Sequence, residues 1–190
     1  MDTHKISVKV NMDAGQQIAP AAWFKTFNKW ISANQGPEVL IDVADYSHVK
    51  NGPVTLLVGH EYDISIDDAG GSRGLLFSRK KPHDGDFGQR LTATVKKTLE
   101  ICRRIETDGD LGETVTFRGG ELNLILNDRL HAPNTDDTFK AVQPEINALL
   151  KTLFGGAKMT TSRPTDPRAR FSVDVRIEGR WPIEKLLANL

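Results

Sequence analysis

The chain lacks several of the features that most readily identify a function. A single cysteine, Cys102, occurs among 190 residues, so no intramolecular disulfide can form. Aromatic residues make up only 7% of the chain, and 25 Lys and Arg residues are balanced by 25 Asp and Glu residues. A formal net charge of zero provides no overall field that would attract nucleic acid or an anionic membrane.

Long apolar runs are also missing. No stretch approaches the roughly 20 apolar residues that a membrane-spanning helix needs. Residues 1–5 lead directly into a strand pattern, without the apolar segment of a signal peptide. We therefore expect a soluble, cytoplasmic protein with no membrane partner.

Apolar periodicity is the strongest positive signal. Ile6, Val8 and Val10 alternate with polar residues, which is typical of a half-buried strand. Apolar stripes at helical spacing follow Pro20, cover residues 88–106, and follow Thr135, which we expect to be an N-cap. Further patterns predict strands at 39–44, 54–66, 75–78, 158–162 and 171–177, a two-residue hairpin at Gly119-Gly120, and a short helix in the last ten residues.

This order of elements predicts an α+β fold, with a mainly antiparallel sheet and three main helices. Residues 5–66 and 121–178 both read as strand, helix, strand, strand, so we expect two pseudo-repeated β-α-β-β halves. We predict a single domain over 1–190, with halves at about 1–82 and 114–190 joined by a helix at 86–107. The sequence leaves open whether the halves form one sheet or two.

Carboxylates and imidazoles concentrate around the second and third predicted strands. If these strands pair through the Asn51-Gly52 turn, Asp42 should lie opposite Glu61, and Asp45 opposite Val58. Such a cluster could bind a divalent cation or perform acid–base chemistry. The candidate binding residues here are Asp42, Asp45, His48, His60, Glu61 and Tyr62.

The structural interpretation of this cluster is the stronger one. The His60-Glu61 pair lacks the second histidine that a helical zinc motif places one turn further on. His60 also falls on the apolar face of its predicted strand, where a hydrogen-bonded core histidine is the more common outcome. Whether His60 and Glu61 line a pocket or a packed core is not decided by the sequence.

A second candidate is the loop that precedes the third main helix. Asp128, Arg129 and His131 lie together there, where backbone N–H groups at a helix N-terminus could hold an anion. The alternative is an Asx-type turn whose side chains only satisfy the loop. The first half has a related loop without the Arg and His, so we favour the turn.

Charge is unevenly distributed along the chain. Acidic residues concentrate in 38–68, and five arginines occur between 163 and 180. A solvated surface is the simplest interpretation, and association with an acidic partner or with a second copy comes next. Nucleic acid is an unlikely partner because the chain is neither basic overall nor rich in exposed stacking aromatics.

The sequence contains no recognisable nucleophile, metal or phosphate-binding signature, and we predict no cofactor. The leading hypothesis is a non-catalytic scaffold or binding module that associates with itself or with a protein partner. The alternative is a small-ligand or metal-binding enzyme with a site around His60, Glu61 and Asp42. Neither hypothesis specifies a ligand, a partner, an oligomeric state or a pathway.

Overall fold

The computed structural model describes residues 1–16, 18–33, 38–111 and 115–190. Four helices and eight strands account for most of these residues, and a short 3₁₀ turn, η1, joins two of the strands. In chain order the elements are β1 (Ile6–Met12), α1 (Pro20–Ser32), β2 (Leu40–Asp45), β3 (Pro53–Gly59), β4 (Tyr62–Asp67), η1 (Ala69–Gly71), β5 (Gly74–Arg79), α2 (Phe87–Glu106), β6 (Phe117–Leu126), α3 (Asp136–Phe154), β7 (Met159–Ser162), β8 (Phe171–Ile177) and α4 (Ile183–Ala188).

All eight strands belong to one antiparallel sheet. Its order is β2-β3-β4-β5-β1-β6-β8-β7, so β1 and β6 pair with each other near its centre. The predicted α+β class with an antiparallel sheet and three main helices is therefore confirmed, and the question of one sheet or two is answered. The pseudo-repeat and the division into halves stay predictions, and residue 114, where the second half was placed to begin, lies outside the described residues.

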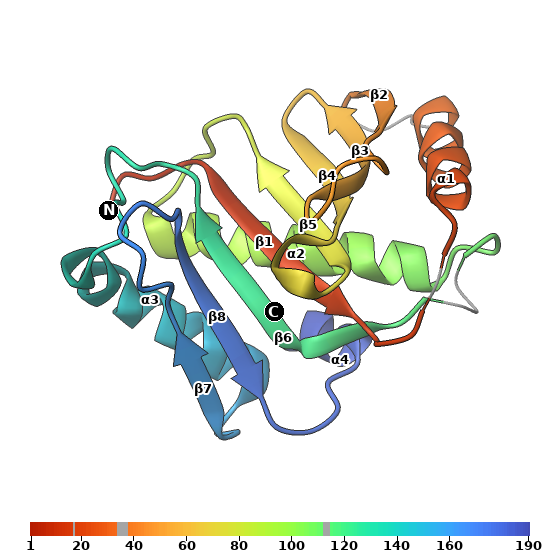
Figure 1. Ribbon diagram of the computed structural model, residues 1–190. Coiled ribbons are helices and arrows are strands. Elements are labelled where there is room, and N and C mark those ends of the chain that lie inside the picture. The colour runs from red at the N-terminus through yellow and green to blue at the C-terminus, as the bar shows by residue number, and fades with distance from the viewer. Residues whose placement is uncertain (17, 34–37, 112–114) are drawn as a thin grey trace.

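The helices cover one face of the sheet (Figure 1). The register aligns one row of buried side chains across the four neighbouring strands β5, β1, β6 and β8: Phe77, Val8, Leu124 and Val173. The helix α2 packs against β1 and β5, α1 against β2 and β3, and α4 against β6. Burial of this apolar face holds the two layers together, because apolar area removed from water is the main favourable term in folding.

The opposite face carries polar side chains from the alternate strand positions. Ser7 and Lys9 of β1 lie on this side, between Ser78 of β5 and Asn123 of β6. We call this side of the sheet the open face. Within the described residues none of α1–α4 packs on it (Figure 1), although the short turn η1 lies over Lys9 there.

The predicted N-cap of the third main helix is confirmed. Thr135 is the N-cap of α3, and its side chain accepts a hydrogen bond from the Thr138 N–H. Pro144 lies inside α3, which continues as one helix from Asp136 to Phe154. Among the described residues, no helix has the length and apolar character needed to cross a membrane.

The single strand predicted over 54–66 is wrong. It is a hairpin, in which β3 ends at Gly59 and β4 begins at Tyr62. Leu57 pairs with Ile64, so these two side chains point to the same face of the sheet. Odd-numbered residues of β3 therefore share a face with even-numbered residues of β4. Leu56 and Val58, which a single strand would place on one face with Ile64, therefore lie on the open face.

The hairpin predicted at Gly119-Gly120 is also wrong. Both glycines lie inside the continuous strand β6, which runs from Phe117 to Leu126. The first error predicted one strand where there are two, and the second predicted two where there is one. The total of eight strands is therefore unchanged, but the hairpin lies between β3 and β4 and not at Gly119-Gly120.

Candidate binding site at the start of β6

The first predicted cluster does not form around the expected strand pairing. Asp42 lies opposite Val58 and Asp45 opposite Thr55, instead of opposite Glu61 and Val58. Both carboxylates are exposed and accept hydrogen bonds from nearby backbone N–H groups. The Ser47 backbone and hydroxyl groups hold the pKa of Asp45 below its usual value.

His60 and Glu61 form the two-residue turn between β3 and β4. The His60 side chain is 55% exposed, and its Nε2 lies 3.8 Å from a Glu61 carboxylate oxygen. His60 is therefore not the core histidine that its place in the strand pattern favoured, because β3 ends one residue before it. His48 is exposed in the preceding loop, with its ring stacked near Tyr46.

Tyr62 lies on the other side of the sheet from Asp42. Its hydroxyl donates to a Glu38 carboxylate oxygen at 2.9 Å, and Lys97 donates to the same oxygen at 2.6 Å. Burial, followed by the hydrogen bond and the charge of Glu38, raises the pKa of the Tyr62 hydroxyl well above its usual value of 10.0. The structure thus does not bring Tyr62 together with the other residues of its predicted cluster.

The second predicted cluster lies beyond the far end of β6. Asp128 accepts from the His131 backbone N–H at 3.1 Å and lies 2.9 Å from the His131 Nδ1. These contacts with His131 hold the pKa of Asp128 below its usual value. This is the bonding of an Asx-type turn, and Arg129 beside it is exposed.

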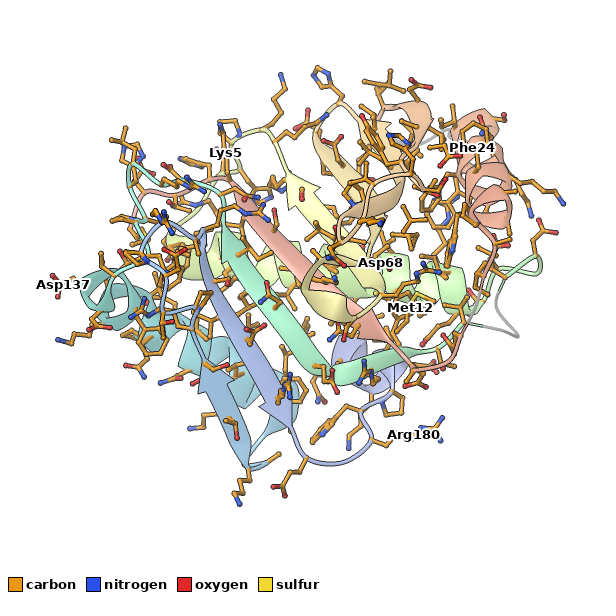
Figure 2. The ribbon with its side chains drawn as sticks, viewed as in Figure 1. Lys5, Met12, Phe24, Asp68, Asp137 and Arg180 are labelled. Atoms are coloured by element: carbon orange, nitrogen blue, oxygen red, sulfur yellow. The ribbon has the colours of Figure 1, made fainter. Side chains whose placement is uncertain are left out.

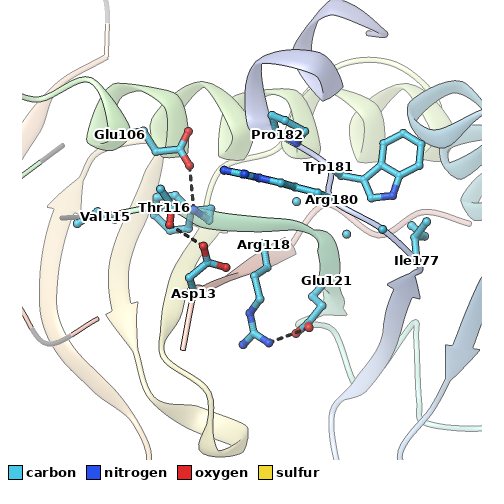
Figure 3. A pocket seen from close by; sticks show the side chains of 14 residues that line it. Asp13, Glu106, Val115, Thr116, Arg118, Glu121, Ile177, Arg180, Trp181 and Pro182 are labelled. Carbon is cyan, nitrogen blue, oxygen red and sulfur yellow. Dashed lines mark hydrogen bonds and ion pairs between the residues drawn. The ribbon is translucent and has the colours of Figure 1, made fainter. Parts of the chain in front are cut away.

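A different group of residues surrounds a hollow of about 500 Å³ at the start of β6 (Figure 3). We call it the β6 hollow. The end of β1, the end of α2 and the segment after β8 all contribute to its walls. Its lining residues are Asp13, Glu106, Val115, Thr116, Phe117, Arg118, Gly119, Gly120, Glu121, Ile177, Gly179, Arg180, Trp181 and Pro182.

Arg118 is held in a fixed position in the wall of the β6 hollow. Its Nε donates to the Met12 carbonyl at 3.0 Å, and its Nη1 donates to Glu121 Oε1 at 2.8 Å. The other Glu121 oxygen accepts from the Asn11 amide at 3.0 Å. Both ends of this Arg–Glu pair are therefore fixed by β1, while Nη2 of Arg118 makes no hydrogen bond within the described part of the chain.

Gly119 and Gly120 allow the chain after β8 to pass close to β6. A Cβ atom on Gly119 would lie 2.3 Å from the Trp181 carbonyl oxygen, and one on Gly120 would lie 3.0 Å from the Ile177 carbonyl oxygen. At Gly119 there is no room for a Cβ atom, and at Gly120 the contact would be tight. This close approach places Arg180 and Trp181 on the wall of the β6 hollow.

Glu106, the last residue of α2, supplies a half-buried carboxyl to the same hollow. One of its oxygens accepts from the Phe117 backbone N–H at 2.8 Å. Burial raises the pKa of the Glu106 carboxyl above its usual 4.5; the Phe117 hydrogen bond opposes the rise, and the nearby Asp13 charge adds to it. Asp13 itself accepts from the Thr116 hydroxyl at 2.6 Å.

Arg180 is the least constrained charge of the site. Its side chain is exposed and, among the described residues, makes no hydrogen bond or ion pair. Figure 3 shows it extending from the segment after β8 back over the start of β6, toward the side on which Glu106 lies. It can therefore turn its guanidinium to an anionic group in the hollow, since a guanidinium offers five N–H donors.

A groove of about 450 Å³ on the open face adjoins the β6 hollow, and Glu121 lines both. Its floor is formed by β1, β6 and β8, and its walls include η1 and the loop before β8. Lys9 is buried beneath η1, where its Nζ donates to Asp67 at 2.8 Å and to the Ala69 carbonyl at 2.7 Å. Asn123 donates to Asp174 on the same floor.

Sequence reasoning missed Arg118, Glu121 and Glu106, and it noted Arg180 only as one of five arginines between 163 and 180. These four residues meet only because β1 pairs with β6 and because the segment after β8 crosses β6. One signal was present in the sequence: glycines within a strand pattern mark a close backbone approach, and Gly119-Gly120 lies between Arg118 and Glu121.

The site residues do not resemble a metal centre. In the part of the chain that the structure describes, no group of three or more His, Cys, Asp or Glu side chains is arranged to hold a metal ion. Cys102 is buried in α2, and burial raises the pKa of its thiol well above the usual value.

Comparison with protein-family models, with curated proteins and with solved structures gave no significant match. A function is therefore inferred from the geometry of the site.

Proposed function

We propose that this protein is a non-catalytic binding module whose ligand is a small zwitterion, of the size of an amino acid or a dipeptide, held in the β6 hollow. The observation that carries the proposal is the arrangement of charge in that hollow. Arg118, Arg180, Asp13 and Glu121 all line it; the unbonded guanidinium of Arg180 would bind the ligand carboxylate, and the carboxylates would bind its ammonium group.

The size and rigidity of the hollow support a small ligand. A volume of about 500 Å³ falls within the range of roughly 300–1,000 Å³ that is usual for small-molecule sites. Arg118 and Glu121 are already fixed by β1, so binding would cost little additional ordering of these side chains.

The proposal is tested by thermal unfolding in the presence of free amino acids and dipeptides. A ligand at a hundred times its Kd stabilises the folded state by about 2.7 kcal/mol. For a domain of this size, that corresponds to a rise in Tm of roughly 5–10 °C. We expect such a rise for at least one zwitterion, and none for the same compound with its amine acetylated or its carboxylate amidated.

Matched variants locate the site. Arg180→Ala should abolish the stabilisation while leaving the Tm of the free protein unchanged, because Arg180 has no partner within the described chain. Arg129→Ala removes another exposed arginine, outside the hollow, and should retain the response. The proposal fails if no zwitterion of the panel raises the Tm, or if Arg129→Ala removes the response and Arg180→Ala does not.

A further inference from the structure

The β6 hollow and the groove on the open face share a wall that is fixed in position. Glu121 lines both spaces. One of its carboxylate oxygens accepts from Arg118 and the other from Asn11, so its charge is compensated and its side chain is held against β1. A zwitterion bound in the hollow can extend its side chain past Glu121 into the groove, which has a volume of about 450 Å³.

Two arginines, one in each space, have no partner. Arg176 is exposed on the open face of β8 and lines the groove. Arg180 lines the hollow and projects into solvent from the segment after β8 (Figure 2). Neither side chain makes a hydrogen bond or an ion pair within the described part of the chain. Each space therefore offers a guanidinium group that is free to bind an anion.

The other cations of the groove are already engaged. Lys9 is buried in its ion pair with Asp67. Arg170, just before the start of β8, donates to the side chain of Asn127. Arg176 is thus the cation of the groove that remains for a ligand.

Arg176 also lies next to the shared wall. In the β6–β8 pair it is directly opposite Glu121, and residues opposite each other on one face of a sheet have Cβ atoms about 4.5–5.5 Å apart. The neighbouring carboxylate on the same face of β8, Asp174, accepts from Asn123 across the strand pair. An anionic group that extends past Glu121 therefore comes within reach of Arg176.

A third space adjoins the hollow beside the loop after β1, and Arg118 lines it as well. Its other arginine, Arg73, donates to both carboxylate oxygens of Asp68, so its charge is compensated. Among the described residues that line the three spaces, only Arg176 and Arg180 have guanidinium groups without a partner. An anionic side chain is therefore better accommodated in the groove than in this third space.

From these observations we infer that the ligand of the β6 hollow carries a second carboxylate, and that Arg176 selects it. The ligand class is then a dicarboxylic amino acid or a dipeptide with one acidic side chain. Arg180 binds the main-chain carboxylate in the hollow, and Arg176 binds the side-chain carboxylate in the groove, since a guanidinium can donate two parallel hydrogen bonds to a carboxylate. This inference rests on the function proposed for the hollow.

The test compares zwitterions that differ only in the charge of their side chain, by isothermal titration calorimetry with the full chain. The pairs are glutamate with glutamine and aspartate with asparagine, each as the free amino acid and as the second residue of a glycyl dipeptide. We expect the acidic member of at least one pair to bind about tenfold more tightly, the usual gain from a hydrogen bond to a charged group.

Variants of Arg176 locate the preference. Arg176→Gln should weaken the acidic compound to the level of its amide, while the Kd of the amide stays unchanged. Arg176→Glu should reverse the preference, so that the amide binds more tightly than the acid. Arg168→Gln is the matched control, because it removes another exposed arginine that lines neither the hollow nor the groove, and it should keep the preference.

The outcomes separate this inference from the proposed function. Equal binding of the acidic compounds and their amides would overturn the inference and leave the proposed function intact. A preference that persists in Arg176→Gln, or that is lost in Arg168→Gln, would overturn it as well. If none of these compounds binds but another zwitterion raises the Tm, only the inference fails. If no zwitterion binds at all, the proposed function fails with it.

Discussion

The side chains of Lys9 and Asp67 form a buried ion pair on the open face of the sheet. Asp67 is 4% exposed and Lys9 6% exposed, and Asp67 also accepts from the Ala69 backbone N–H. The next residue, Asp68, forms a different kind of pair, in which both oxygens accept from Arg73 and both side chains are about one-third exposed. Two adjacent aspartates thus differ mainly in the burial of their partners.

This difference predicts unequal effects of two neighbouring alanine substitutions. Asp67→Ala leaves the Lys9 ammonium buried without its counter-charge, which we expect to cost about 3–5 kcal/mol of unfolding free energy. Asp68→Ala removes a partly exposed pair, for which about 1 kcal/mol or less is expected. Urea unfolding of the two variants measures both values. Equal losses would show that burial of the Lys9 pair is not what stabilises η1 on the sheet.

At the level of the elements, β6 depends on the absence of a side chain at Gly119. We expect Gly119→Ala to lower the unfolding free energy by about 1–3 kcal/mol, the usual cost of overpacking, because the added Cβ would meet the Trp181 carbonyl. Gly156→Ala is the control, since a Cβ there has no atom within 4 Å. Its effect should stay within about 0.5 kcal/mol. A comparable loss in both variants, measured by urea unfolding, would contradict this explanation.

The same element shows what the sequence could and could not predict. Helices were predictable because their stripes and caps are local: Thr135 caps α3 through a bond to Thr138, three residues away. Gly119-Gly120 was misread as a turn. In the sequence, a glycine that is needed because a distant segment passes close to the backbone cannot be distinguished from one that is needed for a positive φ in a turn. The β3–β4 hairpin was misread because apolar residues occur in both phases around Leu57.

The candidate site was less predictable than the fold for a related reason. Arg118 and Glu121 are close in sequence, but Asn11, Glu106 and Arg180 join them only through contacts between distant segments. Composition and spacing therefore drew attention to the locally dense cluster around His60 and Glu61, whose role as a site stays a prediction.

On the scale of the whole molecule, the sheet and α2 connect the two predicted halves. β1 pairs with β6 over most of its length, and α2 packs on β1 and β5 while also contacting α3 and α4. The apolar face of β1 and β5 is thus covered by a helix outside the first half, and that helix also packs on α3 and α4 of the second half. We therefore expect the halves to unfold together, as one cooperative unit.

The three tryptophans allow this expectation to be measured. Trp23 and Trp30 lie in α1, whereas Trp181 packs edge-on against Phe154 of α3. In Trp181→Phe, fluorescence reports only on α1; in the Trp23→Phe/Trp30→Phe variant it reports only on the region around Trp181. Within each variant, the urea midpoint from fluorescence should coincide with that from far-UV circular dichroism, which reports on the whole chain. Each variant thus serves as its own reference, even where the substitution changes total stability. Separate midpoints in either variant would show that the central β1–β6 pairing does not couple the halves, and two independently folding units would then replace the single domain.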